Sequence, residues 1–508
     1  MEEIRDFKSL INRLNSIGIA LSSEHNLSKL LEMIVSELRD FTRSEGGSLY
    51  IKRGDELSFE VAQNQILFLR LGYVPFKTFR IPIDHKSISG YVASTGSLIN
   101  IPNLDEAGSD LPFSLETTRY FDKKNSLKTV SMLVVPMKNH KDEIIGVVQL
   151  MNSHDEMGHP IPYDSWMQEL VVSLASQAAV AITNSVLIQN IKNLFEGLVT
   201  YSAQAIDARS PHTAGHSMRV SHLVMSQAEC INKCKEGQFE HVDFSEEEMD
   251  ELRMASWLHD IGKIGVREYV LDKVNKLSDE VIGGIVNRFD YIKKDRENRA
   301  NLRKLELINS GGLSSKEREL IENESEREII EIDSDIDLIL RMNKPGFYPE
   351  EEYERLQRIG AKKYCSIEGR ECPCLEPFEL EHLLVRKGNL TEKERGEIQS
   401  HVHHTLTILE KLPFTEELSN IPRYAAAHHE MLNGTGYPKG LKGEEIPLQS
   451  RIIAVADIFE ALTAKDRPYK PPMSLETALK VLQTEAKTGK LDPAIVELFV
   501  ADEIYKSV

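Results

Sequence analysis

Histidine and aspartate recur in order through the C-terminal half of the chain. They occur as His216, the pair His259-Asp260, His401, the pair His428-His429, and Asp457. Imidazole and carboxylate together suit iron, manganese or zinc, and a carboxylate can also bridge two ions. Asp457 lies in the apolar run 452–459, where an isolated charge would be costly, so it requires a cation or a hydrogen-bonding partner. A single histidine on a helix is usually a packed or surface residue, but this ordered set in one helical region predicts a metal site.

The residues around these histidines resemble the HD superfamily of metal-dependent phosphohydrolases. The run His428–Pro438 (HHEMLNGTGYP) resembles the signature of the HD-GYP subfamily. The resemblance continues through Gly440–Glu444, Ile446-Pro447, Ala461–Thr463 and Asp466–Lys470. The resemblance extends over residues 195–285 and 388–500. It implies a phosphodiesterase that hydrolyses cyclic di-GMP to the linear dinucleotide pGpG, and often on to GMP, with iron or manganese as the metal.

The resemblance also implies a site with two metal ions and assigns ligands to each. One ion would be held by His216, His259, Asp260 and Asp457, and the second by Asp260 as the bridge with His401, His428 and His429. His212 stands where some members carry a carboxylate that recruits a third ion, so binding of a third ion is an open alternative here. The nearby Pro211 can place His212 in a loop. His403 and His404 are interpreted as packing residues beside His401.

The resemblance further implies catalytic and substrate-binding residues. Asp260 and Lys263 are the expected catalytic residues, and Lys263, Arg467 and Lys470 match the family's phosphate contacts. Tyr437, in the loop 434–438, is expected to border the substrate. For Arg467 and Lys470 the alternative is a solvated charged loop, although an anionic substrate needs local positive charge on a chain of net charge −19.

Three functions are compatible with these residues. The first is a cyclic di-GMP phosphodiesterase regulated through the N-terminal domain. The second is a catalytically weak cyclic-dinucleotide sensor or adaptor that contacts signalling proteins through the loop 434–438. The third is a phosphodiesterase for another cyclic dinucleotide, such as cyclic GMP-AMP. The complete ligand set and Lys263 favour an enzyme, whereas base selectivity depends on the shape of a pocket.

The cysteines suggest a second, structural metal site. Cys365, Cys372 and Cys374 with His382 form a Cys3His set that could hold zinc, although a C-x2-C pair is missing and free thiols are the alternative. Five cysteines, an odd number, do not predict a disulfide framework, which favours a reducing cytoplasm.

Composition excludes several classes of protein. A chain of 508 residues predicts two or more domains, and 61 basic against 80 acidic side chains argues against a general binder of nucleic acid or anionic membranes. The longest nearly apolar stretch, 170–182, is shorter than a membrane span. The N-terminus lacks the pattern of a secretory signal. A cytoplasmic protein without membrane insertion is expected.

The N-terminal part mixes helices and strands. Periodicity predicts helices over 1–24 and 27–41, and strands over 48–51, 57–61, 129–135 and 144–151, with turns at Gly46-Gly47 and Lys141-Asp142. The segments 134–138 and 144–152 resemble a GAF domain, and the resemblance covers about residues 25–190. The domain is placed at residues 25–165, closed by the start of the following helix, and it implies a sensor or a ligandless dimerisation module. No cysteine precedes Cys230, so a thioether-linked bilin is excluded there. The family's cyclic-nucleotide signature is not matched after Asn152, and the ligand stays open.

One helix is expected to join the two parts. Residues 166–207 contain no proline and a single glycine, Gly197, and their apolar positions keep a helical rhythm. This predicts a long connecting helix and a parallel homodimer, with two shorter helices as the alternative. Residues 208–508 are expected to form a helical HD-GYP domain with an insertion at 290–390, which includes the acidic stretch 316–337. The expected fold class is therefore multidomain α+β: a GAF-like sheet domain, a connecting helix, and an all-α HD-type domain with a charged insertion.

Overall fold

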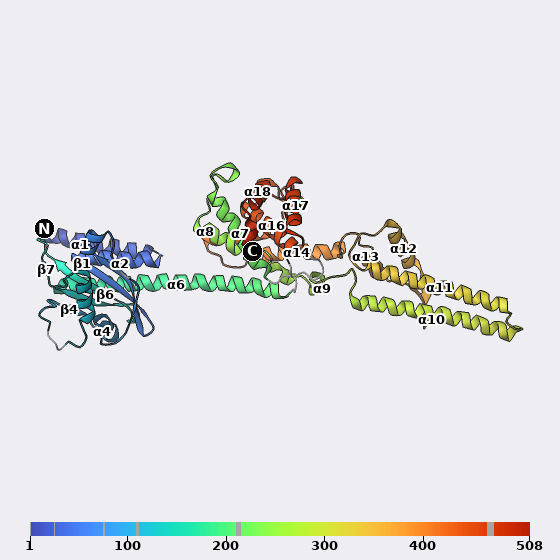
Figure 1. Cartoon of the computed structure of the whole chain (residues 1–508), viewed down its shortest axis with the longest axis horizontal. Helices are drawn as coiled ribbons and strands as arrows, with labels where there is room; N and C mark the ends of the chain where they lie inside the picture. Colours follow the sequence, from blue (N-terminus) through green and yellow to red (C-terminus); the bar gives the residue numbers. More distant parts are fainter. Residues whose placement is uncertain (1, 25, 75–76, 108–110, 210–214, 465–471) are drawn as a thin grey trace. The chain divides into compact units, whose positions relative to one another are not determined.

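The computed structural model describes residues 2–24, 26–74, 77–107, 111–209, 215–464 and 472–508 (Figure 1). The chain divides into two units, Met1–Phe195 and Glu196–Val508. Helix α6, Ser165–Arg209, begins in the first unit and ends in the second. It is one helix of 45 residues, as the unbroken apolar rhythm predicts, and the alternative of two shorter helices is wrong.

The first unit is built on an antiparallel sheet. Its strand order is β3-β2-β1-β6-β5-β4, with β7 paired to β6. The strands are β1 Ser44–Arg53, β2 Glu56–Asn64, β3 Arg80–Pro82, β4 Ile99–Ile101, β5 Met132–Lys138, β6 Ile144–His154 and β7 Pro160–Ile161. The helices of this unit are α1 Glu2–Ser23, α2 Leu27–Thr42, α3 Gln65–Leu71, α4 Ile88–Thr95 and α5 Glu116–Asn125. Together these elements confirm the predicted N-terminal sheet domain.

Apolar side chains cover both faces of this sheet. On one face α1, α2 and α6 pack Leu21, Ile34 and Leu174 against Leu133 and Val148. On the other face α4 and the loops around it bury a second cluster that includes Val92 and Phe113. Gly46 and Gly47 lie inside β1 and do not form the predicted turn. A Cβ atom on Gly47 would lie 2.8 Å from Val35, so glycine permits α2 to approach the strand closely.

By length and composition alone, an 18-residue window of α6 could cross a membrane. The expectation drawn from the shorter stretch 170–182 missed this, because the helix continues beyond Ile182 with few charges. In the structure 44% of that window is buried, and Val171, Ala175 and Ala178 pack into the core of the first unit. These apolar residues therefore have protein neighbours.

The second unit is mostly helical. Its central elements are α7 His216–Lys233, η1 Gly237–Phe239, α8 Glu246–Leu258, η2 Ile261–Gly265, α9 Glu268–Leu271, α14 Glu392–Leu409, η3 Glu416–Leu418, α15 Ile421–Ala426, η4 Gly443–Glu445, α16 Leu448–Thr463, α17 Leu475–Lys487, α18 Pro493–Ala501 and η5 Ile504–Ser507. Side chains cap several helices: Ser245 and Thr391 form capping boxes at α8 and α14. This unit confirms the predicted helical C-terminal domain.

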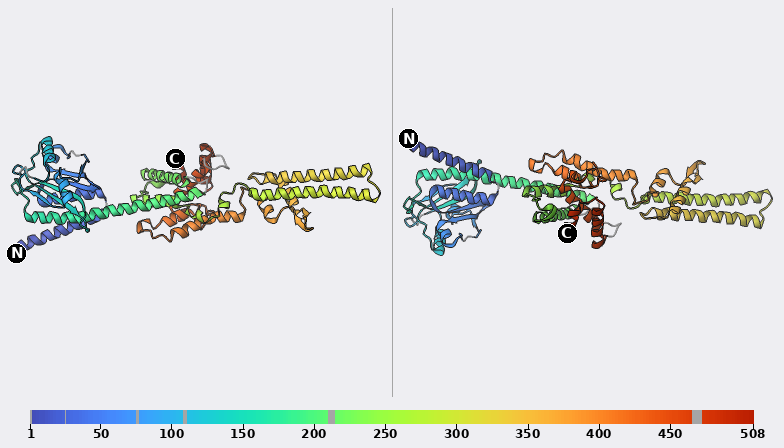
Figure 2. Two further views of the ribbon diagram at one scale, coloured as in Figure 1. Left: turned by 90° about the horizontal axis from the view of Figure 1, so that it is seen from below. Right: turned by 90° about the horizontal axis from the view of Figure 1, so that it is seen from above.

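An inserted subdomain lies between α9 and α14. It comprises α10 Asp279–Ser310, α11 Ser315–Met342, α12 Glu350–Ala361, β8 Lys363–Cys365, β9 Glu371–Pro373 and α13 Pro377–Leu383. Helices α10 and α11 run side by side as a long antiparallel hairpin in both views of Figure 2. Ion pairs join them, including Lys293–Asp333 at 2.6 Å and Arg303–Glu324 at 3.0 Å. The acidic stretch of α11 therefore faces basic side chains of α10 along this hairpin.

The subdomain has a core of its own. Phe289, Leu338 and Leu356 are buried together with residues of α13 and of the loop before it. The strands β8 and β9 form a two-stranded sheet, so the C-terminal domain is not entirely α-helical as predicted. The first helix of the subdomain begins at Asp279 rather than near residue 290, because its N-terminal turns are apolar and pack into this core.

Candidate metal centre

Five structural elements bring the predicted ligands together in the second unit. His216 is the first residue of α7, His259 and Asp260 follow the last turn of α8, His401 lies in α14, His428 and His429 follow α15, and Asp457 lies in α16. All are buried except His429, which is half-buried. Segment η2, Ile261–Gly265, and helix α14 approach closely here: a Cβ atom on Gly262 would lie only 1.9 Å from the carbonyl oxygen of His401. Glycine at this position therefore lets the His259-Asp260 turn reach α14.

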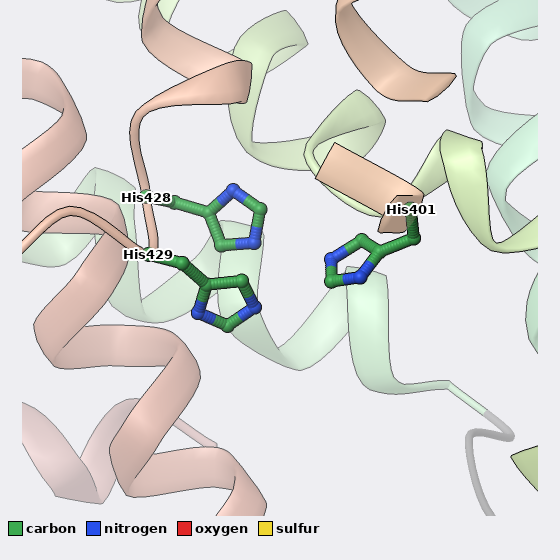
Figure 3. Close-up of side chains that lie close together, drawn as sticks. All are labelled: His401, His428 and His429. Atoms are coloured by element: carbon green, nitrogen blue, oxygen red, sulfur yellow. The ribbon is translucent and has the colours of Figure 1, made fainter. Parts of the chain in front are cut away.

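The ligand atoms form overlapping groups. Among the described residues, three sets have one ligand atom from each residue within 4.8 Å of the others: His401 with His428 and His429, His216 with His259 and Asp457, and His259 with Asp260 and His428. Figure 3 shows the first set, in which the His401 ring faces the rings of His428 and His429 across a short gap. Each set is a plausible cradle for one cation because imidazole nitrogens and carboxylate oxygens converge on it.

Backbone carbonyls orient the imidazole rings. His259 Nδ1 lies 2.7 Å from the Ser256 oxygen, His401 Nδ1 2.6 Å from that of Ile398, and His428 Nδ1 2.6 Å from that of Ala425. A proton on each Nδ1 leaves the Nε2 lone pair directed into the site. Within the described part of the chain, the buried Nε2 atoms of these three residues and of His216 have no hydrogen-bond partner. Orphaned buried acceptors of this kind fit metal ligation.

His216 is oriented differently, by a carboxylate. Its Nδ1 lies 2.5 Å from Oε2 of the buried Glu460, and the other oxygen of Glu460 accepts hydrogen bonds from Arg219 Nε at 2.8 Å and from its terminal nitrogen at 2.5 Å. Burial alone would lower the pKa of His216, but Asp260 and Glu460 outweigh it and raise this pKa to about 9. Sequence reasoning missed Glu460. Its signal was a second charge one helical turn after Asp457 in the same apolar helix.

Asp260 lies at the centre of the site. Its Oδ1 is 3.2 Å from His401 Nε2, whereas its Oδ2 is 3.4 Å from His216 Nε2 and 3.3 Å from His259 Nε2. Its two oxygens therefore face different histidines, which is the arrangement a bridging carboxylate requires. Burial would raise the pKa of Asp260, but Lys263 and His259 hold it well below its ordinary value.

The charge states of His428 and His429 suit metal ligation. Burial and the neighbouring His259 lower the pKa of His428 to about 3, and burial with His428 beside it lowers that of His429 strongly as well. Both rings are therefore neutral near pH 7, as metal binding requires. Lys263 Nζ lies 2.5 Å from Asp260 Oδ2. Burial would lower the pKa of Lys263, but Asp260 raises it, so the amine stays charged.

The loop 434–438 lies beside the histidines. The Tyr437 ring is 4.8 Å from that of His429, and burial raises the pKa of Tyr437. Glu430, which the sequence placed next to His428-His429 without a role of its own, accepts hydrogen bonds from the backbone nitrogens of Lys439 at 2.7 Å and Leu441 at 2.9 Å. This buried carboxylate ties the residues directly after the loop to the His428-His429 turn.

Other predicted residues are not part of this cluster or are not described. His212, Arg467 and Lys470 lie outside the described residues. His404 packs on Gly265 and lies 3.4 Å from the Ser400 hydroxyl, in keeping with a packing role.

The structure does not bring the predicted zinc ligands together. Among the described residues, no group of three potential ligand atoms within 4.8 Å includes Cys365, Cys372, Cys374 or His382. In the β8–β9 ladder Cys365 pairs with Glu371 and Cys372 pairs with Tyr364, so the two cysteines point to opposite faces. His382 instead contacts the Phe378 carbonyl and Glu394. The Cys3His prediction is therefore not supported by the geometry.

Comparison with known protein families agrees with both units. A GAF domain model matches residues 26–182, and two HD domain models match residues 213–357 and 376–495. The chain is a GAF and HD domain protein. A solved structure titled a GAF domain/HD domain protein from Geobacter sulfurreducens is 14% identical, covering 33% of this chain and 98% of that one, with a TM-score of 0.25.

Curated relatives match part of the chain. A 3'3'-cGAMP-specific phosphodiesterase 3 of Vibrio cholerae is 45% identical over 112 residues, which are 22% of this chain and 23% of the relative. A cyclic di-GMP phosphodiesterase of the same organism is 38% identical over 125 residues, 24% of this chain and 25% of the relative. One of the same name from Thermotoga maritima is 38% identical over 127 residues, 24% of this chain and 32% of the relative. The chain thus spans about a quarter to a third of the length of these relatives.

Proposed function

We propose that this GAF and HD domain protein is a metal-dependent phosphodiesterase of the HD-GYP type that hydrolyses cyclic di-GMP to pGpG, with further cleavage to GMP left to the product assay. The observation that carries the proposal is the set of buried, unpartnered Nε2 atoms of His216, His259 and His401 around the two oxygens of Asp260. The unpartnered His428 belongs to the same group, with a ligand atom within 4.8 Å of those of His259 and Asp260. Relatives named as cyclic di-GMP phosphodiesterases support the substrate class.

The residues divide into two sets of metal ligands. His216, His259, Asp260 and Asp457 would hold one ion, and Asp260, His401, His428 and His429 a second. Iron and manganese suit these nitrogen and oxygen donors, and a third ion at His212 remains part of the proposal. Such ions, when bound, lower the pKa of a coordinated water and offset negative charge on a phosphate.

The chain's own groups prepare the site for an anionic substrate. The Lys263 ammonium, with a side chain 24% exposed, adds a positive charge at the rim that a phosphate oxygen can approach. The Nδ1 contacts fix each ring, so the ligands need little reorganisation. We propose that Tyr437 borders the dinucleotide and that Arg467 and Lys470 contact its phosphates.

A second cyclic dinucleotide is a specific alternative. The relative that is 45% identical is named for 3'3'-cGAMP, and cyclic di-GMP and cGAMP present the same phosphodiester chemistry with different bases. The test is a comparison of kcat/KM for the two substrates on protein purified without oxygen, with its metal content measured and pGpG resolved from GMP. A fully metallated protein that leaves both substrates intact would refute the proposal.

Two variants test the site itself. Asp260→Ala and His429→Ala should abolish hydrolysis and lower the bound metal, since each removes a ligand. Asp335→Ala is the matched control, because Asp335 is also buried but pairs with Arg355 and Lys362 in the inserted subdomain. Full activity in Asp260→Ala would contradict the assignment, whereas metal loss in Asp335→Ala would indicate a general folding defect.

We also propose that the chain is a cytoplasmic parallel homodimer through α6. Leu187, Ile191, Leu194, Leu198 and Tyr201, here named the α6 stripe, are 51–71% exposed. Their spacing alternates between four and three residues, which is the heptad pattern of a coiled coil. Leu187 and Leu194 take d positions and Ile191 an a position, and leucine at d with a β-branched residue at a favours a parallel coiled coil of two helices. The exposed Asn184 takes another a position, where asparagine specifies register.

Light scattering after gel filtration tests the dimer. Wild type should have twice the 57.6 kDa mass of one chain, and Leu194→Glu should be monomeric. Leu302→Glu, which changes a leucine of similar exposure in the α10–α11 hairpin, should remain dimeric. A monomeric wild type would contradict the proposed coiled coil. The proposal also includes regulation of hydrolysis by the GAF domain through this helix. It does not assign a ligand to the GAF domain.

A further inference from the structure

The last turn of α6 is hydrogen-bonded to the helix that carries His216. Asp207 is buried, and its two carboxylate oxygens accept hydrogen bonds from the Ser217 backbone nitrogen at 3.0 Å and the Ser217 hydroxyl at 3.1 Å. Ser217 directly follows His216. The N-cap of α7 is Gly215, which has no side chain to accept from the first turn. Asp207 therefore supplies from another helix the acceptor that the N-cap residue lacks.

The same turn is also bonded to the segment that carries Lys263. Arg209, the last residue of α6, donates to the carbonyl oxygens of Ile264 at 2.9 Å, Val266 at 3.0 Å and Lys263 at 3.3 Å. These carbonyls belong to η2 and the residue after it, directly downstream of Asp260. Arg209 thus gathers three carbonyls of one short segment, because the fork of guanidinium donors suits several acceptors at once. The Lys263 oxygen also accepts from the Val266 backbone nitrogen at 3.1 Å.

The rest of the C-terminal part of α6 packs on its own unit through one face. Val199 and Ala203 are buried, and Glu196 forms an ion pair with Arg253 of α8 at 2.9 Å. Leu198 and Tyr201 of the α6 stripe are exposed on the other face. A change in the rotation or position of α6 would therefore reach α7 and η2 through Asp207 and Arg209.

We infer that Asp207 and Arg209 are positioning residues that join the end of α6 to the metal site. This inference rests on the proposed function, because it assigns their effect to His216 and to the Asp260–Lys263 segment as parts of a metal site. Hydrogen bonds weaken steeply once donor and acceptor separate or lose alignment. Loss of either residue leaves the first turn of α7 or the η2 carbonyls free to shift, which misplaces ligands that must converge within a few tenths of an ångström.

The first test measures metal affinity on the full chain without substrate. Titration with Mn²⁺ should show affinity about 10-fold weaker in Asp207→Ala and Arg209→Ala, the lower end of the loss typical for residues that orient ligands. Asp207→Asn and Arg209→Lys, which keep an acceptor and a donor, should recover part of the affinity. Arg253→Gln, which removes the ion pair with Glu196 of α6, should bind Mn²⁺ like wild type. Wild-type affinity in both alanine variants would overturn the inference, as would an equal loss in Arg253→Gln.

Turnover and folding separate the remaining outcomes. Thermal unfolding identifies a variant that merely fails to fold, and in that case the Asn and Lys variants decide the inference by the same titration. At saturating Mn²⁺ the alanine variants should lose turnover mainly in kcat, since no substrate contact is removed. A loss confined to KM would overturn the positioning role. If wild type binds Mn²⁺ but hydrolyses no cyclic dinucleotide, the proposed function fails while the Mn²⁺ affinities still decide the role of Asp207 and Arg209.

Discussion

Replacing Glu460 with glutamine tests whether the buried carboxylate of Glu460 is needed to orient His216 as a metal ligand. Glu460 accepts from His216 with one oxygen and from Arg219 with the other. Glutamine keeps the shape but has one acceptor atom, so its amide NH2 group must face either His216 or Arg219, both of which are donors there. The His216 ring then loses its orientation or its tautomer, and its Nε2 atom no longer points at Asp260 and Asp457.

The size of the effect follows from the kind of contact. Losing a group that orients a metal-bound histidine typically weakens metal affinity 10- to 100-fold, which is about 1.4–2.7 kcal/mol. Breaking a buried ion pair also destabilises the fold, by about 3–5 kcal/mol when one partner is deleted. The two effects must be separated, because a partly unfolded protein also binds less metal.

Glu379→Gln is the matched control for Glu460→Gln. Glu379 is as buried as Glu460 and pairs with Arg288 through both of its oxygens, at 2.7 and 3.0 Å, but it lies in the inserted subdomain. Calorimetric titration with Mn²⁺ should give weaker binding for Glu460→Gln and unchanged binding for Glu379→Gln, while thermal unfolding reports similar losses of stability. Wild-type Mn²⁺ affinity in folded Glu460→Gln would refute the reasoning.

Three further predictions follow from the same geometry. Lys263→Ala should reduce turnover while metal stays bound, because Lys263 contributes charge and is not a ligand; loss of metal together with activity would show that the lysine has a structural role. Replacing residues 297–327 by a short Gly-Ser linker should preserve hydrolysis, since the side chains of Arg296 and Glu328 pair across the hairpin at the cut, with Nε and Oε2 3.7 Å apart, and the subdomain core is retained; a folded but inactive product would place the hairpin in the catalytic mechanism. Removing metal with a chelator should lower the melting temperature by several degrees, because free metal at 100 times its Kd adds about 2.7 kcal/mol to the free energy of unfolding; an unchanged melting temperature would argue against a bound ion.

The regular elements with strong periodicity could be predicted from the sequence. The helix 27–41 corresponds to α2, the connecting helix to α6, and the four long strands to β1, β2, β5 and β6. The short strands β3, β4 and β7 were not predicted, because segments of two or three residues carry no readable alternation and are paired only through their neighbours. The same holds for Gly46 and Gly47, whose place inside β1 depends on the approach of α2.

The zinc prediction shows where spacing alone is insufficient. Three cysteines and a histidine within the inserted subdomain satisfy a ligand count, yet a β-ladder alternates side chains between its two faces. The pairing of Cys372 with Tyr364 and of Cys365 with Glu371 separates the thiols. Which residues oppose each other is set by the hairpin register, and the motif does not contain that information.

The sequence by itself determined the kinds of ligand, their order and the helices in or next to which they lie, because these depend on residue type and local periodicity. Only the tertiary structure decided that the Nδ1 atoms face carbonyls or Glu460, that Asp260 faces different histidines with its two oxygens, and that Asp207 and Arg209 reach the site from the end of α6. The physical reason is that a hydrogen bond weakens steeply when donor and acceptor move apart or lose their alignment. That alignment is set by how segments as far apart as residues 216 and 460 pack against each other.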